Sequence, residues 1–246
     1  MQDAISENVK EVILFAGGSA TVDAGTGIMQ ALGLTLLDKN NTAIPTNINA
    51  LPHVSSLKMD KNKLPKGLDF KIICDVSNPL YGPMGAAQVY GPQKGASEKE
   101  VEVLDAGMQH LSTLFGDLGI DIKTEKPGMG AAGGIALATA LLNPQLIQGA
   151  SYFIQKSLLE EHMAKADLII TGEGRYDDQS QMGKITGEII KRAKDMGKKL
   201  VLICGTSNSP LPGANLIRFD QLDLDGEDSF SSPEKYLRLA VRMIEK

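Results

Sequence analysis

The chain has 246 residues, 42% of them apolar, and a formal net charge of −5 from 25 basic and 30 acidic side chains. This length holds one large domain or two small ones, with enough apolar residues for a buried core, which excludes a disordered tail. Because positive charge is not in excess and no basic run occurs, neither nucleic acid nor a membrane surface is the expected partner.

The start of the sequence and the two cysteines bear on the compartment. The first residues lack the basic region and apolar stretch of a secretory signal, and no segment reaches the roughly 20 apolar residues of a membrane span. Cys74 and Cys204 each lie in an apolar run, which is typical of small buried side chains and argues against a disulfide framework or a zinc site. We therefore expect a cytoplasmic protein.

Four short apolar runs predict the strands of the fold. They cover residues Val12–Phe15, Ile72–Cys74, Leu168–Ile170 and Leu200–Cys204. Their hydrophobicity is continuous rather than alternating, which is typical of strands buried on both faces in a parallel sheet covered by helices. The predicted fold class is α/β.

Segments with helical periodicity lie between these runs. The clearest begins with the capping box Ser97-Glu-Lys-Glu100, after which apolar residues follow at spacings of three and four. The other predicted helices cover Thr26–Leu32, Gly130–Leu142, Ser151–Ala164, Gly183–Met196 and, with Ser232 as N-cap, Pro233–Ile244. The stretch from Asn40 to Lys66 is predicted to be a long connection or a peripheral excursion.

Polar residues follow each apolar run. In an open parallel sheet, ligands bind at the carboxyl ends of the strands, so residues 16–23, 75–79, 171–177 and 205–207 are the candidate binding segments. Their glycines let the backbone approach an anion, their hydroxyl groups donate to it, and their carboxylates can hold Mg²⁺ or accept a proton. The set suits phosphoryl chemistry, although tight turns and helix caps explain any one segment equally well.

Two glycine motifs fit nucleotide-binding patterns only in part. Gly128–Gly133 has the spacing of a dinucleotide fingerprint, but it follows a Lys-Pro pair instead of a buried strand. Gly183-Lys184 resembles part of a P-loop, whose first glycine would fall at Asp178 and whose Ser or Thr would fall at Ile185. We expect neither site. The small residues from Gly128 to Ala140 allow close helix packing, with or without an anion at the helix N-terminus.

Five longer motifs lie in order along the chain. They are Gly17-Gly-Ser-Ala-Thr-Val-Asp-Ala-Gly25, Asp75-Val-Ser-Asn-Pro-Leu-Tyr-Gly-Pro83, Val89-Tyr-Gly-Pro-Gln-Lys-Gly95, Pro127-Gly-Met-Gly-Ala-Ala-Gly-Gly134 and Ala166-Asp-Leu-Ile-Ile-Thr-Gly-Glu-Gly-Arg-Tyr-Asp177. In this order they resemble the motifs of the bacterial glycerate kinase family. The departures within the matched span are Val22, Ala24, Met129 and Thr186, and none of them removes an ionisable group.

The resemblance implies ATP-dependent phosphorylation of D-glycerate to 2- or 3-phosphoglycerate, with Mg²⁺, between two α/β domains with largely parallel sheets. On this basis we expect a central α/β domain over residues 1–160 and half of a second domain over residues 161–246. Family members also carry an N-terminal segment with a Pro-Asp-Ser-Phe-Lys-Gly string, which does not occur here. We therefore expect an incomplete second domain, with a homo-oligomer or a complementing N-terminal polypeptide as partner.

The resemblance also suggests roles for individual residues. Lys94 and Arg175 are the expected catalytic partners of anionic oxygens. Asp23, Glu173 or Asp177 is expected to act as metal ligand or proton acceptor. Mg²⁺ is expected at Glu173 and Asp177. The expected contacts to substrate or phosphate are Gly17, Gly18, Ser19, Thr21, Asp75, Asn78, Gly172, Gly174 and Lys184. Lys94 as a solvated surface lysine and Asp177 as a helix cap remain the alternatives.

Two further function classes stay open at this level. The chain could be a non-catalytic ligand-binding fragment or subunit whose site is completed by another polypeptide. A sugar-acid or sugar-phosphate isomerase would use a similar sheet without ATP, so stabilisation by nucleotide would argue against it.

Overall fold

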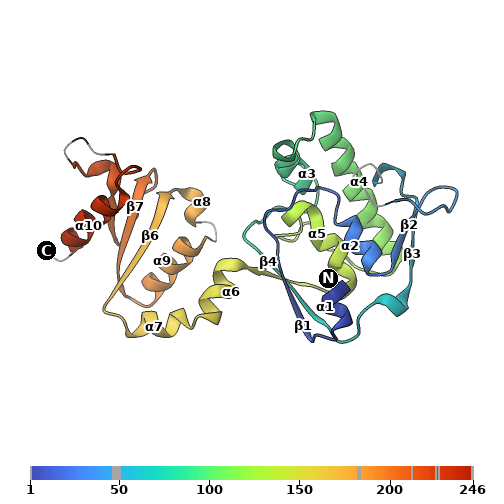
Figure 1. The fold of residues 1–246 in the computed structure, drawn as a ribbon, viewed down its shortest axis with the longest axis horizontal. Coiled ribbons are helices and arrows are strands. Elements are labelled where there is room, and N and C mark those ends of the chain that lie inside the picture. The colour runs from blue at the N-terminus through green and yellow to red at the C-terminus, as the bar shows by residue number, and fades with distance from the viewer. Residues whose placement is uncertain are drawn as a thin grey trace. The chain divides into compact units, whose positions relative to one another are not determined.

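The computed structural model describes residues 2–45, 51–181, 184–211, 213–224, 226 and 228–244. The chain divides into two compact units, unit 1 (Met1–Ile147) and unit 2 (Gln148–Lys246), each with its own three-stranded sheet (Figure 1). The division precedes the boundary expected after residue 160, because helix α6 (Gly149–Lys156) packs against helices of unit 2.

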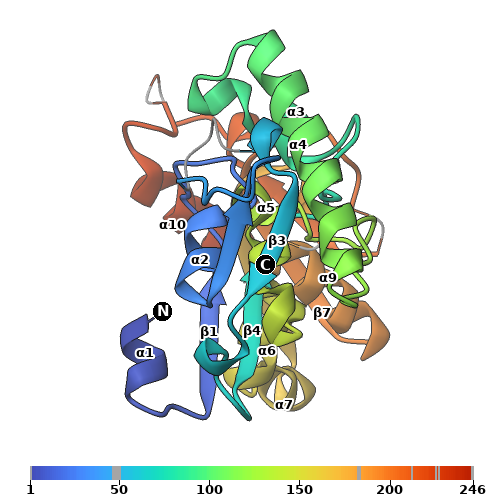
Figure 2. The ribbon, with the colours of Figure 1, turned by 90° about the vertical axis from the view of Figure 1, so that its right-hand side faces the viewer.

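The sheet of unit 1 has the order β1-β4-β5, formed by β1 (Glu11–Phe15), β4 (Asp69–Cys74) and β5 (Gln145–Gln148). β1 and β4 are parallel and lie side by side (Figure 2). The central strand β4 is largely buried, whereas Phe15 on the edge strand β1 is 54% exposed. Both cysteines are buried and free, as predicted.

An antiparallel pair of strands completes the β structure of unit 1. β2 (Leu34–Leu37) pairs with β3 (Ser56–Met59), and Figure 2 shows the two strands together. β3 and the short 3-10 helices η1 (Leu51–His53) and η2 (Lys61–Lys63) lie in the stretch predicted to be a long connection. A plain long connection is therefore the wrong alternative for these residues, and a peripheral excursion is not contradicted. A four-residue strand such as Ser-Leu-Lys-Met gives little sequence signal.

The helices of unit 1 cover the sheet and enclose the larger core. They are α1 (Gln2–Ser6), α2 (Thr26–Ala31), α3 (Ala86–Tyr90), η3 (Pro92–Lys94), α4 (Glu98–Asp117), α5 (Ala131–Thr139) and η4 (Ala140–Leu142). The capping box of α4 forms as predicted: the Glu100 N–H donates to Ser97 Oγ and the Ser97 N–H donates to Glu100 Oε2. The apolar stripe of α4 is buried beside Phe70 of β4.

Helix α5 differs from the expected regular helix. Ala132, Gly133 and Gly134 have φ values of 50°, 75° and 88°, so its first turn contains a left-handed segment. Side chains other than glycine and asparagine adopt this conformation at a cost, which makes Ala132 a strained position.

The sheet of unit 2 is parallel and has the order β6-β7-β8. It consists of β6 (Leu168–Tyr176), β7 (Lys199–Ser207) and β8 (Asn215–Arg218). β6 and β7 stay paired from Leu168 opposite Lys199 to Tyr176 opposite Ser207, so residues 171–176 and 205–207 are strand and not the expected loops. The prediction that the strands are buried on both faces is confirmed for the central strands β4 and β7. It is wrong for the edge strands, since Ile170 of β6 is 53% exposed.

Helices lie on both faces of the second sheet. They are α6, α7 (Leu159–Lys165), α8 (Asp178–Gln181), α9 (Ile185–Asp195), the 3-10 helix η5 (Phe219–Gln221) and α10 (Pro233–Ile244). α7 and α9 pack with Leu200 of β7, whereas Ala240 of α10 packs with Val201, and adjacent strand residues point to opposite faces. These covered parallel sheets confirm the α/β class.

One helix prediction of unit 2 needs correction, and the start of another is not tested. The helix expected over residues 151–164 is divided at Leu158, whose φ of 54° is left-handed, into α6 and α7. The predicted start of α9 at Gly183 lies outside the described residues, and its described part begins at Ile185. None of the helices in the described ranges has both the length and the apolar character needed to cross a bilayer.

Candidate functional site

The first candidate site lies in unit 1, where the loops after the parallel strands β1 and β4 leave the same edge of the sheet. A cavity of about 230 Å³ opens there. Its lining includes Gly17, Gly18, Ser19, Tyr90, Lys94 and Ala132. Four of the expected site residues, from two motifs far apart in the sequence, therefore meet around one small cavity.

Lys94 links two segments at this cavity. Its ammonium group donates to Ser19 Oγ and to the Thr21 carbonyl oxygen, both at 2.8 Å. Burial lowers the pKa of Lys94, and the negative charge of Asp23 acts in the opposite direction. Lys94 is half-buried and hydrogen-bonded, which differs from the alternative of a solvated surface lysine.

Asp23 is engaged in the turn that enters α2. Its Oδ1 accepts from Thr21 Oγ1 and from the Gly25 N–H, each at 3.1 Å, and its Oδ2 accepts from Thr26 Oγ1 at 3.3 Å. Gly25 has a φ of 69°, so the turn needs both the left-handed glycine and an acceptor for its N–H. These bonds give Asp23 a structural role beside any role towards a ligand.

Asn78 is similarly engaged in holding its own loop. The Tyr90 hydroxyl donates to Asn78 Oδ1 at 2.6 Å, and Asn78 Nδ2 donates to the Met84 carbonyl oxygen at 2.9 Å. Burial raises the pKa of Tyr90, with a further contribution from Cys74. Asp75 stands exposed directly after β4.

Sequence reasoning missed Tyr90 and Asp105 at this site. Tyr90 belongs to the Val89–Gly95 motif, which would have pointed to it. Asp105 is a single acidic residue on α4, and both of its carboxylate oxygens accept from the Gly82 N–H in the loop after β4. A lone Asp on a helix carries no sequence signal for such a long-range contact.

The left-handed turn of α5 presses against the glycine loop after β1. A Cβ atom placed on Gly133 would lie 2.2 Å from the Thr21 carbonyl oxygen, and the Ala24 N–H donates to the Gly133 carbonyl oxygen at 3.0 Å. Glycine is therefore required at position 133 both for its φ and for space. The contact fixes the backbone at Thr21, the residue whose carbonyl accepts from Lys94.

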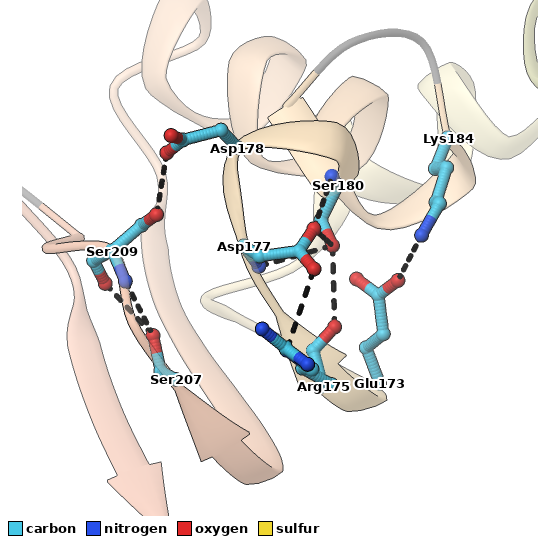
Figure 3. Close-up of polar contacts among 8 residues, drawn as sticks. All are labelled: Glu173, Arg175, Asp177, Asp178, Ser180, Lys184, Ser207 and Ser209. Atoms are coloured by element: carbon cyan, nitrogen blue, oxygen red, sulfur yellow. Dashed lines mark hydrogen bonds and ion pairs between the residues drawn. The ribbon is translucent and has the colours of Figure 1, made fainter.

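The second candidate site lies in unit 2 at the carboxyl end of β6 (Figure 3). Glu173 Oε1 is 3.5 Å from Lys184 Nζ, and the two side chains point toward each other. The other oxygen, Oε2, is buried and has no hydrogen-bond partner among the described residues. A buried carboxylate oxygen without a donor is costly, so this atom calls for a cation or a donor from a ligand.

Asp177 lies beside Arg175 in the same view, with Oδ2 3.5 Å from the Arg175 Nε. Asp177 Oδ1 also accepts from the N–H of Ser180 at 3.2 Å, which caps the short helix α8. Burial alone would raise the pKa of Asp177, but the Ser180 N–H bond and the charges of Lys184 and Arg175 outweigh it and lower the pKa. Asp177 therefore caps helix α8, and the same carboxylate also pairs with Arg175 where the catalytic role is expected.

Packing bears on only one of the two glycines of β6. A Cβ atom on Gly172 would lie 3.2 Å from the Ile203 carbonyl oxygen, whereas a Cβ atom on Gly174 would meet nothing within 4 Å. On the neighbouring strand β7, a Cβ atom on Gly205 would lie 2.6 Å from the Gly174 carbonyl oxygen. Ser209 Oγ donates to Asp178 Oδ1 at 2.6 Å, which ties the segments after β6 and β7 together (Figure 3). Close strand packing thus favours glycine at positions 172 and 205, but it does not account for Gly174.

The described residues contain no group of three or more His, Cys, Asp or Glu side chains placed to share a metal ion. Mg²⁺ is commonly held by one or two carboxylates together with substrate phosphates and water. Glu173, with its unpartnered oxygen, and Asp177 at the end of the same strand fit that smaller requirement.

Comparison with known proteins identifies the family. The model of the glycerate kinase family matches residues 1–222. The chain belongs to the glycerate kinase family. The glycerate kinase of Halalkalibacterium halodurans is 38% identical over 207 residues, which are 83% of this chain and 54% of that protein. The glycerate 2-kinase of Escherichia coli is 38% identical over 208 residues, 82% of this chain and 54% of that protein.

The fold agrees with a solved glycerate kinase structure. The crystal structure of the "putative glycerate kinase 2" of Salmonella typhimurium LT2 superposes with a TM-score of 0.74 at 33% identity, covering 99% of this chain and 65% of that one. The chain spans about half the length of the curated glycerate kinases that it matches.

Proposed function

We propose that this member of the glycerate kinase family takes part in the ATP-dependent, Mg²⁺-requiring phosphorylation of D-glycerate to phosphoglycerate. The observation that carries the proposal is the family match over residues 1–222, supported by relatives named glycerate kinase at 38% identity. The polar groups at the strand ends of each unit suit phosphoryl transfer. A cytoplasmic location belongs to the proposal, because ATP and phosphoglycerate are metabolites of that compartment.

Phosphoryl transfer requires positioning and charge neutralisation and no covalent nucleophile. A glycerate hydroxyl attacks the γ-phosphoryl group in line with the departing ADP oxygen. In unit 1, Lys94 and Ser19 offer an ammonium group and a hydroxyl at one cavity. In unit 2, the exposed guanidinium of Arg175 offers a fork of donors that suits anionic oxygens.

The unpartnered oxygen of Glu173 supports a role for this residue in holding Mg²⁺ with Asp177. When bound, the ion would neutralise charge on the phosphate oxygens. Lys184, 3.5 Å from Glu173, balances the carboxylate charge, and Arg175 does so for Asp177. These two ion pairs would keep the carboxylates neutralised until Mg²⁺ and the phosphates bind.

The test is ADP release with D-glycerate and Mg·ATP, measured on the chain alone and with the N-terminal part of the Halalkalibacterium halodurans glycerate kinase added. The added polypeptide or a homo-oligomer is the partner that the proposal allows. We expect turnover that depends on D-glycerate and Mg²⁺ in at least one preparation. Coupling to enolase, which accepts only 2-phosphoglycerate, identifies the hydroxyl that reacts, with the 2-hydroxyl suggested by the Escherichia coli relative's name.

Two results would contradict the proposed kinase function. If both preparations are folded and neither releases ADP with D-glycerate, the proposal is wrong. Nucleotide binding without turnover in both would favour the non-catalytic subunit instead. Stabilisation against heat by Mg·ATP would argue against an isomerase.

A further inference from the structure

The cavity beside Lys94 in unit 1 suits one of the two substrates better than the other. Resting on the kinase function proposed above, we propose that this cavity binds the small hydroxy acid, and that the Lys94 ammonium pairs with the acid's carboxylate. The nucleotide then binds elsewhere. The alternative occupant is a phosphate group of the nucleotide, which offers the same anionic oxygens.

The charge balance of the cavity calls for an anion. Lys94 Nζ donates to two neutral oxygens, Ser19 Oγ and the Thr21 carbonyl. Within the described part of the chain no carboxylate forms an ion pair with Lys94, and the carboxylate oxygens of Asp23 already accept from the turn into α2. Burial lowers the pKa of Lys94, so a carboxylate brought to the cavity would stabilise the charged ammonium group.

The size of the cavity favours the acid. A volume of about 230 Å³ equals that of roughly seven or eight water molecules at about 30 Å³ each, which is enough to hold a three-carbon hydroxy acid together with water. A nucleoside triphosphate has about four times as many non-hydrogen atoms. Pockets that enclose such larger ligands usually measure about 300–1,000 Å³.

The lining suits the rest of a hydroxy acid. Gln93 offers a donor and an acceptor for hydroxyl groups, and Ser19 can donate its hydroxyl hydrogen while it accepts from Lys94. Tyr90 is held in place by its bond to Asn78. Gly133 packs against the backbone of Thr21, so the Thr21 carbonyl that accepts from the Lys94 ammonium group is held in position without a ligand.

The test measures KM for D-glycerate and for ATP separately, together with calorimetric binding of D-glycerate, in the preparation that shows turnover or otherwise in the chain alone. Lys94→Met removes the ammonium group with little change in length. We expect it to raise KM and Kd for D-glycerate at least tenfold and to change KM for ATP less than twofold. Lys58→Met, at an exposed position of β3, is the matched control and should change neither constant.

Ser19→Ala keeps the ammonium group and serves if Lys94→Met does not fold. It should raise KM for D-glycerate severalfold, again without effect on ATP. A change confined to ATP, or an equal change for both substrates, overturns the acid site and leaves the kinase function standing. If the wild type binds D-glycerate without turning it over and Lys94→Met abolishes that binding, the acid site stands and the kinase function falls. If the wild type does not bind D-glycerate at all, the acid site is wrong.

Discussion

Both carboxylate oxygens of Asp105 accept from the backbone N–H of Gly82, at 2.9 and 3.1 Å. The residues belong to helix α4 and to the loop after β4, and Gly82 has a left-handed φ of 92°. Burial raises the pKa of Asp105, while the Gly82 bond opposes that shift. The contact anchors the loop that also carries Asn78.

Asp105→Asn is expected to change how stability depends on pH. Because the folded pKa of Asp105 is raised, the folded state binds the proton more tightly than the unfolded state, whose pKa is about 3.9. The wild type should therefore lose free energy of unfolding relative to the variant as the pH rises from about 4 through the folded pKa. Urea unfolding between pH 3.5 and 7 measures this difference, and a constant difference would contradict it.

Gly133→Ala tests the contact between the left-handed turn and Thr21. The new Cβ meets the Thr21 carbonyl oxygen and the φ is unfavourable, so we expect a loss of about 1–3 kcal/mol in the free energy of unfolding. The matched control is Gly116→Ala near the end of α4, where a Cβ meets nothing within 4 Å and helix propensity favours alanine by up to about 1 kcal/mol. Equal destabilisation of both variants would show that the contact is unimportant.

Substitutions at Asp177 separate its cap from its proposed chemistry. Asn keeps an oxygen that can accept from the Ser180 N–H, whereas Ala does not. If the negative charge acts in catalysis, Asp177→Asn lowers kcat more than tenfold, about 1.4 kcal/mol in the barrier, with a smaller loss of Tm than Asp177→Ala shows. Asp177→Ala should lower both. A kcat that follows Tm in the two variants would assign Asp177 to structure alone.

The lowered pKa of Asp177 predicts how the stability difference between wild type and Asp177→Ala depends on pH. A folded pKa lowered below its ordinary value means that the charged group stabilises the fold above the unfolded pKa of about 3.9. The Tm difference between wild type and Asp177→Ala should therefore be present at pH 7 and shrink as the pH falls through the folded value. A difference that grows on acidification would contradict this.

Glu173→Gln removes the charge from the carboxylate whose second oxygen has no partner. If Glu173 holds Mg²⁺, the Mg²⁺ concentration for half-maximal activity should rise at least tenfold, because a neutral amide is a weaker ligand for a hard cation. Glu160→Gln, which alters a carboxylate paired with Arg192 on the surface of unit 2, should leave this concentration unchanged. An unaltered Mg²⁺ dependence in Glu173→Gln would remove the residue from the metal site.

Local chemistry made parts of the fold predictable. The capping box at Ser97 and the proline at position 233 act within one helical turn, and both helices begin where expected. The left-handed residues Ala132 and Leu158 were not predictable, since their side chains show no preference for that conformation and tertiary packing imposes it.

The sequence also predicted some features of the candidate sites and not others. The motifs indicated Ser19 and Lys94 separately, but their contact joins residues 75 positions apart and depends on the folded unit. The extent of β6 could not be predicted, because Thr171–Tyr176 contains two glycines and charged residues that are unusual inside a strand.

The placement of Glu173 and Arg175 within a paired strand limits how this region can change in length. Side chains alternate between faces along a strand, so one residue inserted or deleted in β6 before Glu173 would turn both groups to the opposite face. The described residues between β7 and β8 are not part of a paired strand, so no such alternation applies to them. Natural variation in length should therefore collect after Ser207 and be excluded from the stretch between Leu168 and Tyr176.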